Sequence, residues 1–230
     1  MMILKSIEIN NVEKIKNLKV NFKPGLTLVV SDYAKSNSFI RALNWILGIG
    51  SEGCIEPNVN TEAIQDLVNI GYPMCNMFVE LQFLINNKEM TIRKMVSFYV
   101  KGKYIDCTST IIYLNGNEID INELNKFIIE NEIEYNQILS KDLMYFTKKP
   151  DKINTKDIID DVYWSHELLD FMSNDNHILV LNHCFDYLSN ERIKKCIKDI
   201  HLIDKQVIYV CSYKDKFHYE NNWRHYENII

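Results

Sequence analysis

An unbroken apolar run, Ile178 to Leu181, constrains the fold of this chain more than any other stretch. The run is too short for a helix of its own and is rich in β-forming residues, which is typical of a buried parallel strand. Asn182 and His183 follow it directly, and a second such strand is predicted at Gln206 to Ser212. In open α/β sheets, ligands bind just beyond the carboxyl ends of the strands. Asn182 and His183 therefore stand where chemistry is expected.

The composition is that of a globular protein. At 230 residues the chain suits one large α/β domain, or one domain with a subdomain, and it can bury a sizeable core. Its content of 47% hydrophobic and 25% charged residues is ordinary. The net charge of -5 argues against a wholly basic protein that wraps nucleic acid, although it leaves room for a local basic patch.

The cysteines and the apolar runs indicate a compartment. The 6 Cys are scattered without a C-x-x-C pair, so we interpret them as reduced thiols of an intracellular protein. No charged-then-apolar leader opens the chain, and no run approaches the roughly 20 apolar residues that span a membrane. We therefore expect a cytoplasmic protein that does not bind membranes.

The first half of the chain predicts a series of strands and tight turns. Ile3 to Ile9 is expected to form an edge strand with Leu18 to Phe22 as its hairpin partner, and Leu26 to Val30 is apolar enough to be central. Further hairpin turns are predicted at Asn86-Asn87 and at Asn115-Gly116. The predicted helices are Phe39 to Leu47, Thr61 to Val68 with Thr61 as its cap, and Asn122 to Glu130.

The order of these elements resembles the head of SMC and RecF type ATPases, which are ABC-type P-loop proteins. The resemblance is carried by the opening strands and "PGL", by the helix FIRALNWILG, by the run IIYLNGNEIDINELNKFIIENEI, and by the Walker B-like strand ending at Asn182. It implies an α/β fold with a mixed sheet, an antiparallel β subdomain and flanking helices. It also implies a single domain over residues 1–230, with an N-terminal lobe of about 1–149 and a C-terminal lobe of about 150–230. In the family a long coiled coil extends from the head domain at the position where this chain has only a short polar loop, Phe146 to Lys156.

The phosphate loop of that family needs glycines, a lysine and a Ser or Thr at a helix N-terminus. Counting back from Trp45 puts Ser36 at the position of the lysine and Asn37 at that of the Ser or Thr. An alternative register keeps Lys35 and Ser36 as the Lys-Ser pair, with a shorter loop. The simplest interpretation is an ordinary strand, turn and helix with Ser36 as the N-cap. The residues available for a nucleotide here, without any glycine, are Ser31, Asp32, Tyr33, Ala34, Lys35, Ser36, Asn37 and Ser38.

The other nucleotide motifs of the family are altered as well. Asn182 stands for the Asp that holds Mg²⁺, and His183 stands for the Glu that orients water. Ser140 occupies the position of the Q-loop Gln, and Ser212 occupies that of the trailing His. The signature positions, Ile153 to Asp157, lack their glycines. Because phosphoryl transfer needs phosphate, metal and water held together, the resemblance implies a pseudo-ATPase with no cofactor.

Two other kinds of site are disfavoured. His183, Asp186 and Ser212 could suggest a hydrolytic triad, but the chain has no G-x-S-x-G nucleophile elbow. A metal site of His183 with His177 and Cys184 is also disfavoured, because neighbouring residues on a strand point to opposite faces. We therefore expect no metal.

The partners are predicted from the family and from the C-terminal tail. The resemblance implies a homodimer or a complex with an SMC or ABC-type ATPase, with DNA reached through the partner, in DNA repair, segregation or defence. Aromatic residues anchor many protein interfaces, and the tail of this chain is rich in them. The residues of the tail expected to make the interface are Phe217, Tyr219, Trp223 and Tyr226.

The alternative function is that of a weak ATP- or DNA-binding protein that holds ATP and Mg²⁺ through Lys35 and Ser36.

Overall fold

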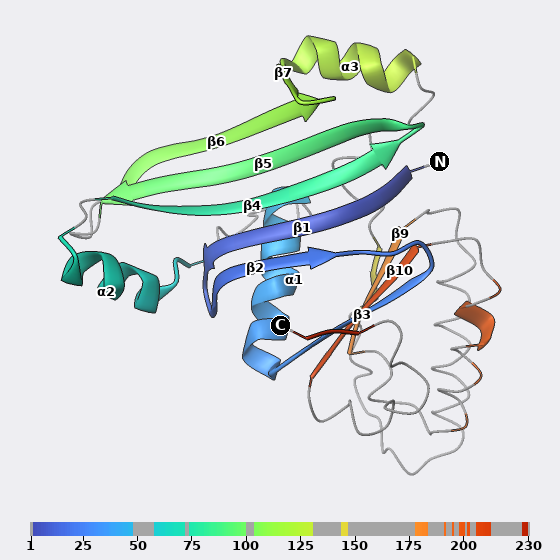
Figure 1. Cartoon of the computed structure of the whole chain (residues 1–230), viewed down its shortest axis with the longest axis horizontal. Helices are drawn as coiled ribbons and strands as arrows, with labels where there is room; N and C mark the ends of the chain where they lie inside the picture. Colours follow the sequence, from blue (N-terminus) through green and yellow to red (C-terminus); the bar gives the residue numbers. More distant parts are fainter. Residues whose placement is uncertain are drawn as a thin grey trace. The chain divides into compact units, whose positions relative to one another are not determined.

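The computed structural model of this chain describes residues 2–47, 58–71, 74–99, 104–130, 144–146, 178–183, 191, 195, 198–200, 202, 206–212 and 227–229. The chain forms two compact units. The antiparallel unit comprises Met1–Phe22 and Asn37–Lys141, and the parallel unit comprises Lys23–Ser36 and Asp142–Ile230. Each unit is built on one sheet (Figure 1). The predicted α/β class with an antiparallel β subdomain is confirmed, with parallel and antiparallel strands in separate sheets.

The sheet of the antiparallel unit has the strand order β2-β1-β4-β5-β6-β7, and every neighbouring pair is antiparallel. Tight turns join its hairpins, and the predicted turns at Asn86-Asn87 and Asn115-Gly116 are confirmed by positive φ angles at all four residues. Asn and Gly tolerate this conformation better than other residues do. The strands are β1 (Met2–Val12), β2 (Ile15–Asn21), β4 (Met74–Ile85), β5 (Lys88–Tyr99), β6 (Tyr104–Leu114) and β7 (Asn117–Ile119).

The prediction that the first strand is an edge strand is wrong. β1 pairs with β2 on one side and with β4 on the other, so that β2 is the edge. The cause of the error is a register shift between Leu4 and Ser6, which interrupts the alternation of buried side chains along β1. A bulge in a central strand produces the same imperfect alternation as an edge strand does.

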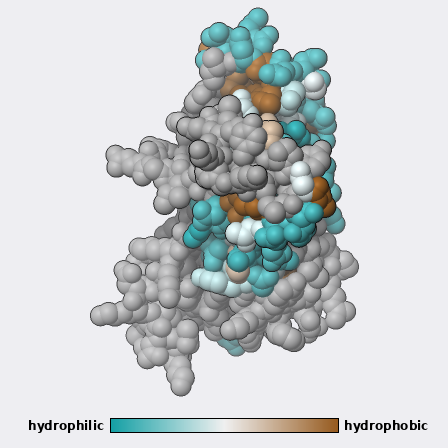
Figure 2. Space-filling view, turned by 90° about the vertical axis from the view of Figure 1, so that its left-hand side faces the viewer, coloured by the Kyte–Doolittle hydropathy of each residue, from teal (hydrophilic) through white to brown (hydrophobic). Residues whose placement is uncertain are grey.

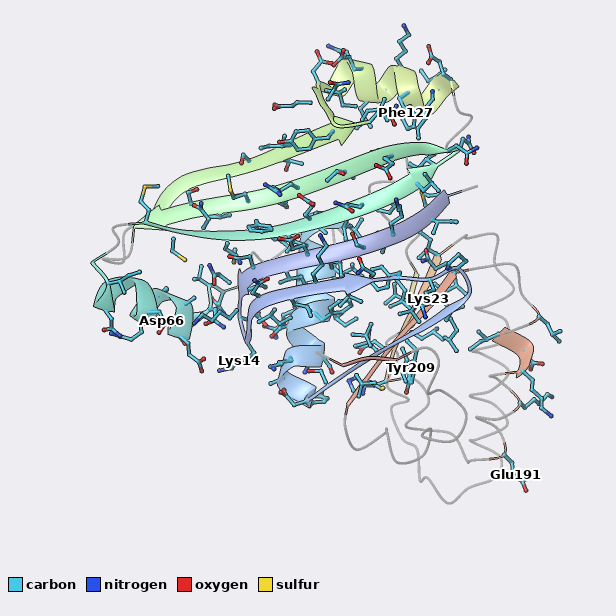
Figure 3. The ribbon with its side chains drawn as sticks, viewed as in Figure 1. Lys14, Lys23, Asp66, Phe127, Glu191 and Tyr209 are labelled. Atoms are coloured by element: carbon cyan, nitrogen blue, oxygen red, sulfur yellow. The ribbon has the colours of Figure 1, made fainter. Side chains whose placement is uncertain are left out.

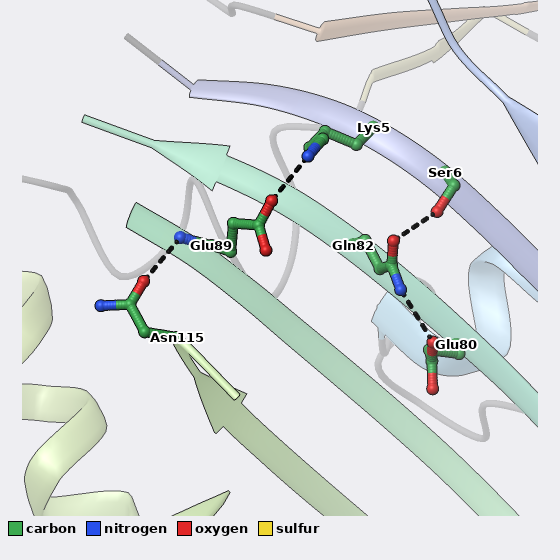
Figure 4. Close-up of polar contacts among 6 residues, drawn as sticks. All are labelled: Lys5, Ser6, Glu80, Gln82, Glu89 and Asn115. Atoms are coloured by element: carbon green, nitrogen blue, oxygen red, sulfur yellow. Dashed lines mark hydrogen bonds and ion pairs between the residues drawn. The ribbon is translucent and has the colours of Figure 1, made fainter. Parts of the chain in front are cut away.

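A row of polar side chains crosses β1, β4 and β5 on one face of this sheet. Ser6 Oγ donates to Gln82 Oε1 at 3.0 Å, and Gln82 Nε2 donates to Glu80 Oε1 at 3.2 Å (Figure 4). Arg93 Nε donates to the second carboxylate oxygen of Glu80 at 2.7 Å. Because Glu80 is only 6% exposed, these hydrogen bonds offset the cost of burying its polar side chain. The row therefore fixes the register of the three strands.

The helices with described bounds are α1 (Tyr33–Leu47), α2 (Thr61–Asn69) and α3 (Ile121–Glu130), and residues 191, 195, 198–200 and 202 are helical as well. The cap of α2 is Asn60, whose Oδ1 accepts from Ala63 N at 2.9 Å, so the predicted cap at Thr61 is off by one residue. Asp120 caps α3, and Glu123 returns the bond to the backbone N–H of Asp120 at 3.0 Å. This reciprocal pair is a capping box.

The sheet of the parallel unit has the order β11-β3-β10-β9-β8, and all its pairs are parallel. Every residue of β3 is buried, as are Ile178–Leu181 in β9, which confirms both as interior strands. Tyr209 of β10 has one of the largest fully buried side chains (Figure 3). The strands are β3 (Leu26–Ser31), β8 (Met144–Phe146), β9 (Ile178–Asn182), β10 (Gln206–Ser212) and β11 (Glu227–Ile229).

On the face drawn in Figure 2, the described residues are mostly polar. Figure 2 shows one face, on which hydrophilic residues surround smaller hydrophobic patches. Across the described residues, no helix has the length and apolarity that crossing a membrane would require. The exposed large hydrophobic side chains are Tyr33, Ile70, Met74, Ile129 and Leu202.

Candidate functional site

The candidate site lies at the carboxyl edge of the parallel sheet, where β3, β10 and β9 end side by side. In the register of these strands, Ser31 is the partner of Ser212 and Asn182 is the partner of Val210. The backbone N–H of His183 donates to the carbonyl of Val210 at 2.9 Å and so continues the ladder past the end of β9. The predicted strand ends are therefore brought together, as the sequence implied.

Helix α1 begins at Tyr33, well before its predicted start at Phe39. Its N-cap is Asp32, whose Oδ1 accepts from Lys35 N at 2.9 Å and whose carbonyl accepts from Ser36 N at 2.9 Å. The predicted cap at Ser36 is therefore wrong. Asp caps a helix as well as Ser does, and the glycine-free residues after it are compatible with a helix.

Only Asp32 separates the end of β3 at Ser31 from the start of α1 at Tyr33. A phosphate loop binds its anion with several backbone N–H groups that turn inward, and it needs a longer glycine-rich segment to do so. Here the carboxylate of Asp32 accepts from the first turn of the helix. An acidic side chain of the protein therefore lies at the helix N-terminus, where the dipole favours an anion.

The two serines of α1 that were expected near a nucleotide are engaged in the protein's own structure. Ser36 is fully buried, and its Oγ donates to the carbonyl of Cys211 in β10 at 3.1 Å. This bond ties the first turn of α1 to the sheet of the parallel unit. Ser36, at the position where the family has a phosphate-binding lysine, is thus a small residue whose hydroxyl makes a hydrogen bond within the protein.

Ser38 belongs to the antiparallel unit, as does Asn37. Its Oγ donates to Glu13 Oε2 at 3.1 Å, and the other carboxylate oxygen of Glu13 pairs with Arg41 Nη1 at 2.8 Å. Lys14 N donates to Ser38 Oγ at 3.3 Å. Ser38 is 1% exposed, so its hydroxyl serves the β1–β2 turn.

His183 has a left-handed backbone, with φ of 52°. Among residues other than glycine, His is one of the few found often in this region. Its imidazole is 8% exposed and lies 5.5 Å from the ring of Tyr33, at an angle of 47° between the ring planes. Tyr33 itself is 65% exposed. His183, which occupies the position of the family's catalytic Glu, is therefore buried and in contact with an aromatic ring.

Two oxygens at this edge have no hydrogen-bond partner among the described residues. They are Ser31 Oγ, at the end of β3, and Asn182 Oδ1, at the end of β9. Buried polar atoms of this kind are often bonded to ordered water. Asn182 offers a neutral amide oxygen where the family has a carboxylate. Ala34 is exposed and Lys35 is partly exposed.

Part of the predicted site lies outside the described residues. This holds for Ser140, for Ile153 to Asp157, and for the alternative ligands Asp186, His177 and Cys184. It also holds for the four aromatic residues of the tail that were expected to form an interface, namely Phe217, Tyr219, Trp223 and Tyr226. Among the described residues, no group of three or more His, Cys, Asp or Glu is placed to hold a metal.

Sequence reasoning missed the roles of Asp32 and Glu13. Asp32 could have been found, because Asp before residues compatible with a helix is a standard cap signal. Glu13 could not, because its partners Ser38 and Arg41 are distant in sequence.

The fold has solved counterparts. The SMC head domain from Thermotoga maritima is 15% identical, with a TM-score of 0.53 over 92% of this chain and 89% of that chain. An SMC head bound to the C-winged helix domain of ScpA is 13% identical, with a TM-score of 0.52 over 91% of this chain and 89% of that chain. The chain has the fold of an SMC head. The predicted resemblance is thus confirmed at the level of the fold, which is all that identities this low can show.

Other comparisons add little to the SMC-head fold. The recombination mediator RecF bound to ATP is 18% identical, but its TM-score is 0.29, over 52% of this chain and 28% of that chain, so it carries no argument. A scan against protein-family models found no match, and neither did a search of the curated proteins.

Proposed function

We propose that this chain is a catalytically degenerate SMC-head-like protein that acts as an interaction or scaffold subunit. The observation that supports this best is the single-residue connection between β3 and α1, with Asp32 as the helix cap. A triphosphate brings several negative charges, and this helix N-terminus already has a carboxylate. Binding ATP there would set like charges against each other and would require the cap to open.

The metal and water positions support the same proposal. Mg²⁺ prefers carboxylate ligands, and the neutral amide of Asn182 is a weaker one. A residue that orients attacking water must reach the reaction centre, whereas His183 is only 8% exposed and lies beside the ring of Tyr33. The alternative, ATP held by Lys35 and Ser36, is opposed by the bond of the Ser36 hydroxyl to Cys211.

The proposed partners are proteins. One structure with this fold is an SMC head bound to the C-winged helix domain of ScpA, so the fold itself can present a protein-binding surface. By analogy, we propose that this chain associates with itself or with an SMC or ABC-type ATPase in a cytoplasmic DNA-processing complex. DNA would then be contacted through the partner.

The experiment is a measurement of Mg²⁺-dependent phosphate release by the purified chain. We expect no release above background, whereas a typical enzyme turns over at about 10 per second. An active SMC head in the same buffer is the positive control. Release at about 0.1 per second or faster would overturn the pseudo-ATPase proposal. Affinity capture from the native host, with and without ATP, then tests whether a protein partner is held independently of nucleotide.

A further inference from the structure

The two sides of the antiparallel sheet, β2 on one side and the part of β6 beyond the short strand β7 on the other, differ in how they are protected. The edge strand β2 carries Lys16 and Lys19, which pair with Asp66 of α2 and with Glu8 of β1. Lysines on an edge oppose pairing with another chain, because a joined strand would bury their charge. In contrast, β6 contains no Lys, Arg or Pro, and its sequence YIDCTSTIIYL is rich in β-forming residues.

The free part of the β6 edge is bounded on both sides. The short strand β7 pairs only with Ile112 to Leu114 (Figure 1). Toward the other end, the register shifts so that Ser97 faces Cys107 while Phe98 faces Tyr104, which leaves residues 105–106 as a bulge. Among the described residues, no strand pairs with the outer edge of residues 107–111, whose register with β5 is regular. The free edge is therefore this stretch, and its centre is Ser109.

One hydrogen bond shows which backbone groups of β6 face away from the sheet. Asn115 N donates to Glu89 O at 2.7 Å, so the backbone of Asn115 faces β5. Figure 4 draws a second bond between the same residues, in which Glu89 N donates to Asn115 Oδ1 at 3.0 Å. In an antiparallel ladder, successive residues direct their N–H and C=O groups to alternate sides. Ser109 is an even number of residues from Asn115 and also faces β5. Thr108 and Thr110 therefore direct their backbone donors and acceptors away from the sheet.

We propose that two copies of this chain join through their β6 edges, antiparallel to each other, about a two-fold axis at Ser109. Thr108 of one copy then lies opposite Thr110 of the second copy, and each such pair exchanges both backbone hydrogen bonds. Ser109 faces Ser109 of the second copy as a pair without backbone hydrogen bonds, with Cα atoms about 4.5 Å apart. The two sheets become one sheet across the axis.

A second copy fits this edge for three reasons. The register about Ser109 is the one in which the whole free stretch is paired, because any shift would meet the bulge or Ile112, whose outer side β7 already occupies. The register sets Thr against Thr, a favourable cross-strand pair. The one charged residue of the strand, Asp106, lies in the bulge, so no like charges oppose each other across the axis. A two-fold contact of this kind closes at the dimer.

The contact between two β6 edges would give the proposed scaffold protein a dimer interface. It does not depend on the scaffold role, because an active ATPase could have the same edge. Cross-linking tests the geometry of this contact. Full-length S109C, T108C and T110C are made in a C107S background, so that the neighbouring native thiol does not compete. Each is oxidised mildly without nucleotide, and the C107S parent reports the background from the remaining native cysteines. A disulfide requires Cα atoms roughly 4.4 to 6.8 Å apart.

We expect S109C to give several-fold more disulfide-linked dimer than T108C or T110C alone. A mixture of T108C with T110C should give more than either of them alone, because these residues face each other across the axis. Equal cross-linking of all three variants, or none above the parent, would overturn the proposal. Pairing of the edge with a strand of some other protein would also give no S109C dimer from the purified chain.

A second variant tests the backbone bonds. T110P removes an outward-facing N–H without removing a bond to β5, whereas T110V keeps the N–H. We expect light scattering over a range of concentrations to show a several-fold lower dimer fraction for T110P than for T110V, with the same far-UV circular dichroism. Equal dimer fractions, or a monomer at all concentrations, would overturn the contact between the β6 edges and leave the nucleotide question untouched.

Discussion

The cap of α1 can be tested with glycine substitutions at Asp32 and Ser36, because the two assignments of the cap predict opposite orders of stability. Glycine is a tolerable N-cap, and replacing a polar cap by Gly costs only a few tenths of a kcal/mol. In a helix interior, Gly costs about 1 kcal/mol relative to Ala. The positions of the two residues therefore determine which glycine variant is the less stable.

Ser36 lies inside α1 and donates to Cys211 O at 3.1 Å from a fully buried position. S36G removes that hydrogen bond, leaves a buried carbonyl with one partner fewer, and places Gly within the helix. The bond is worth about 1 kcal/mol, and replacing Ser by Gly within a helix costs about 0.5 kcal/mol, so we expect a loss of about 1.5 kcal/mol. D32G should cost only a few tenths, and D32A about 1 kcal/mol.

The assay is urea or thermal unfolding of D32G, D32A, S36G and S36A. For a chain of this size, 1 kcal/mol shifts Tm by about 2 to 4 °C. We therefore expect S36G to melt about 3 to 6 °C below the parent and D32G within about 1 °C of it. A nearly neutral S36G together with a costly D32G would refute the placement of the helix start, and with it the argument against a phosphate loop.

Three further predictions concern other groups. The double variant N182D/H183E should show no phosphate release, because carboxylates help only where phosphates are already held nearby; turnover in a colorimetric phosphate assay would contradict this. Lys94 Nζ donates to the carbonyl of Trp45 at 3.0 Å and lies 5.0 Å from its ring centroid, so K94M should lower stability by about 1 to 2 kcal/mol and K94R by less. Burial raises the pKa of the Cys75 thiol, so Cys75 should react with a thiol reagent much more slowly in the folded chain than in urea. Mass spectrometry at pH 8 follows the reaction, and equal rates would show that the thiol is accessible in the folded chain.

The strands and turns could be predicted because their signals are local. β3, β9 and β10 are runs of buried apolar residues. The turns at Asn86-Asn87 and Asn115-Gly116 use residues that tolerate positive φ. The position of β1 was missed because the bulge after Leu4 imitates an edge pattern. That strand becomes central only through pairing with β4, which is distant in sequence.

The site was predicted less well than the fold. The sequence identified which residues end the strands, and the register confirms that Asn182 and Ser31 flank β10. The helix start was missed because the family pattern favours a loop after β3, whereas the local cap signal at Asp32 favours an immediate helix. The bond of Ser38 to Glu13 and the tilted ring contact of Tyr33 with His183 arise from tertiary contacts, which neither spacing nor propensity encodes.

The central claim is that this SMC-head fold has no working nucleotide site. The most direct measurement is calorimetric titration of the full-length chain with ATP and Mg²⁺ into the millimolar range, beside an active SMC head as control. We expect saturable heat from the control and only heat of dilution from this chain. Saturable binding with a dissociation constant in the micromolar range, abolished by K35A, would show that ATP is held at the start of α1 and would contradict the account.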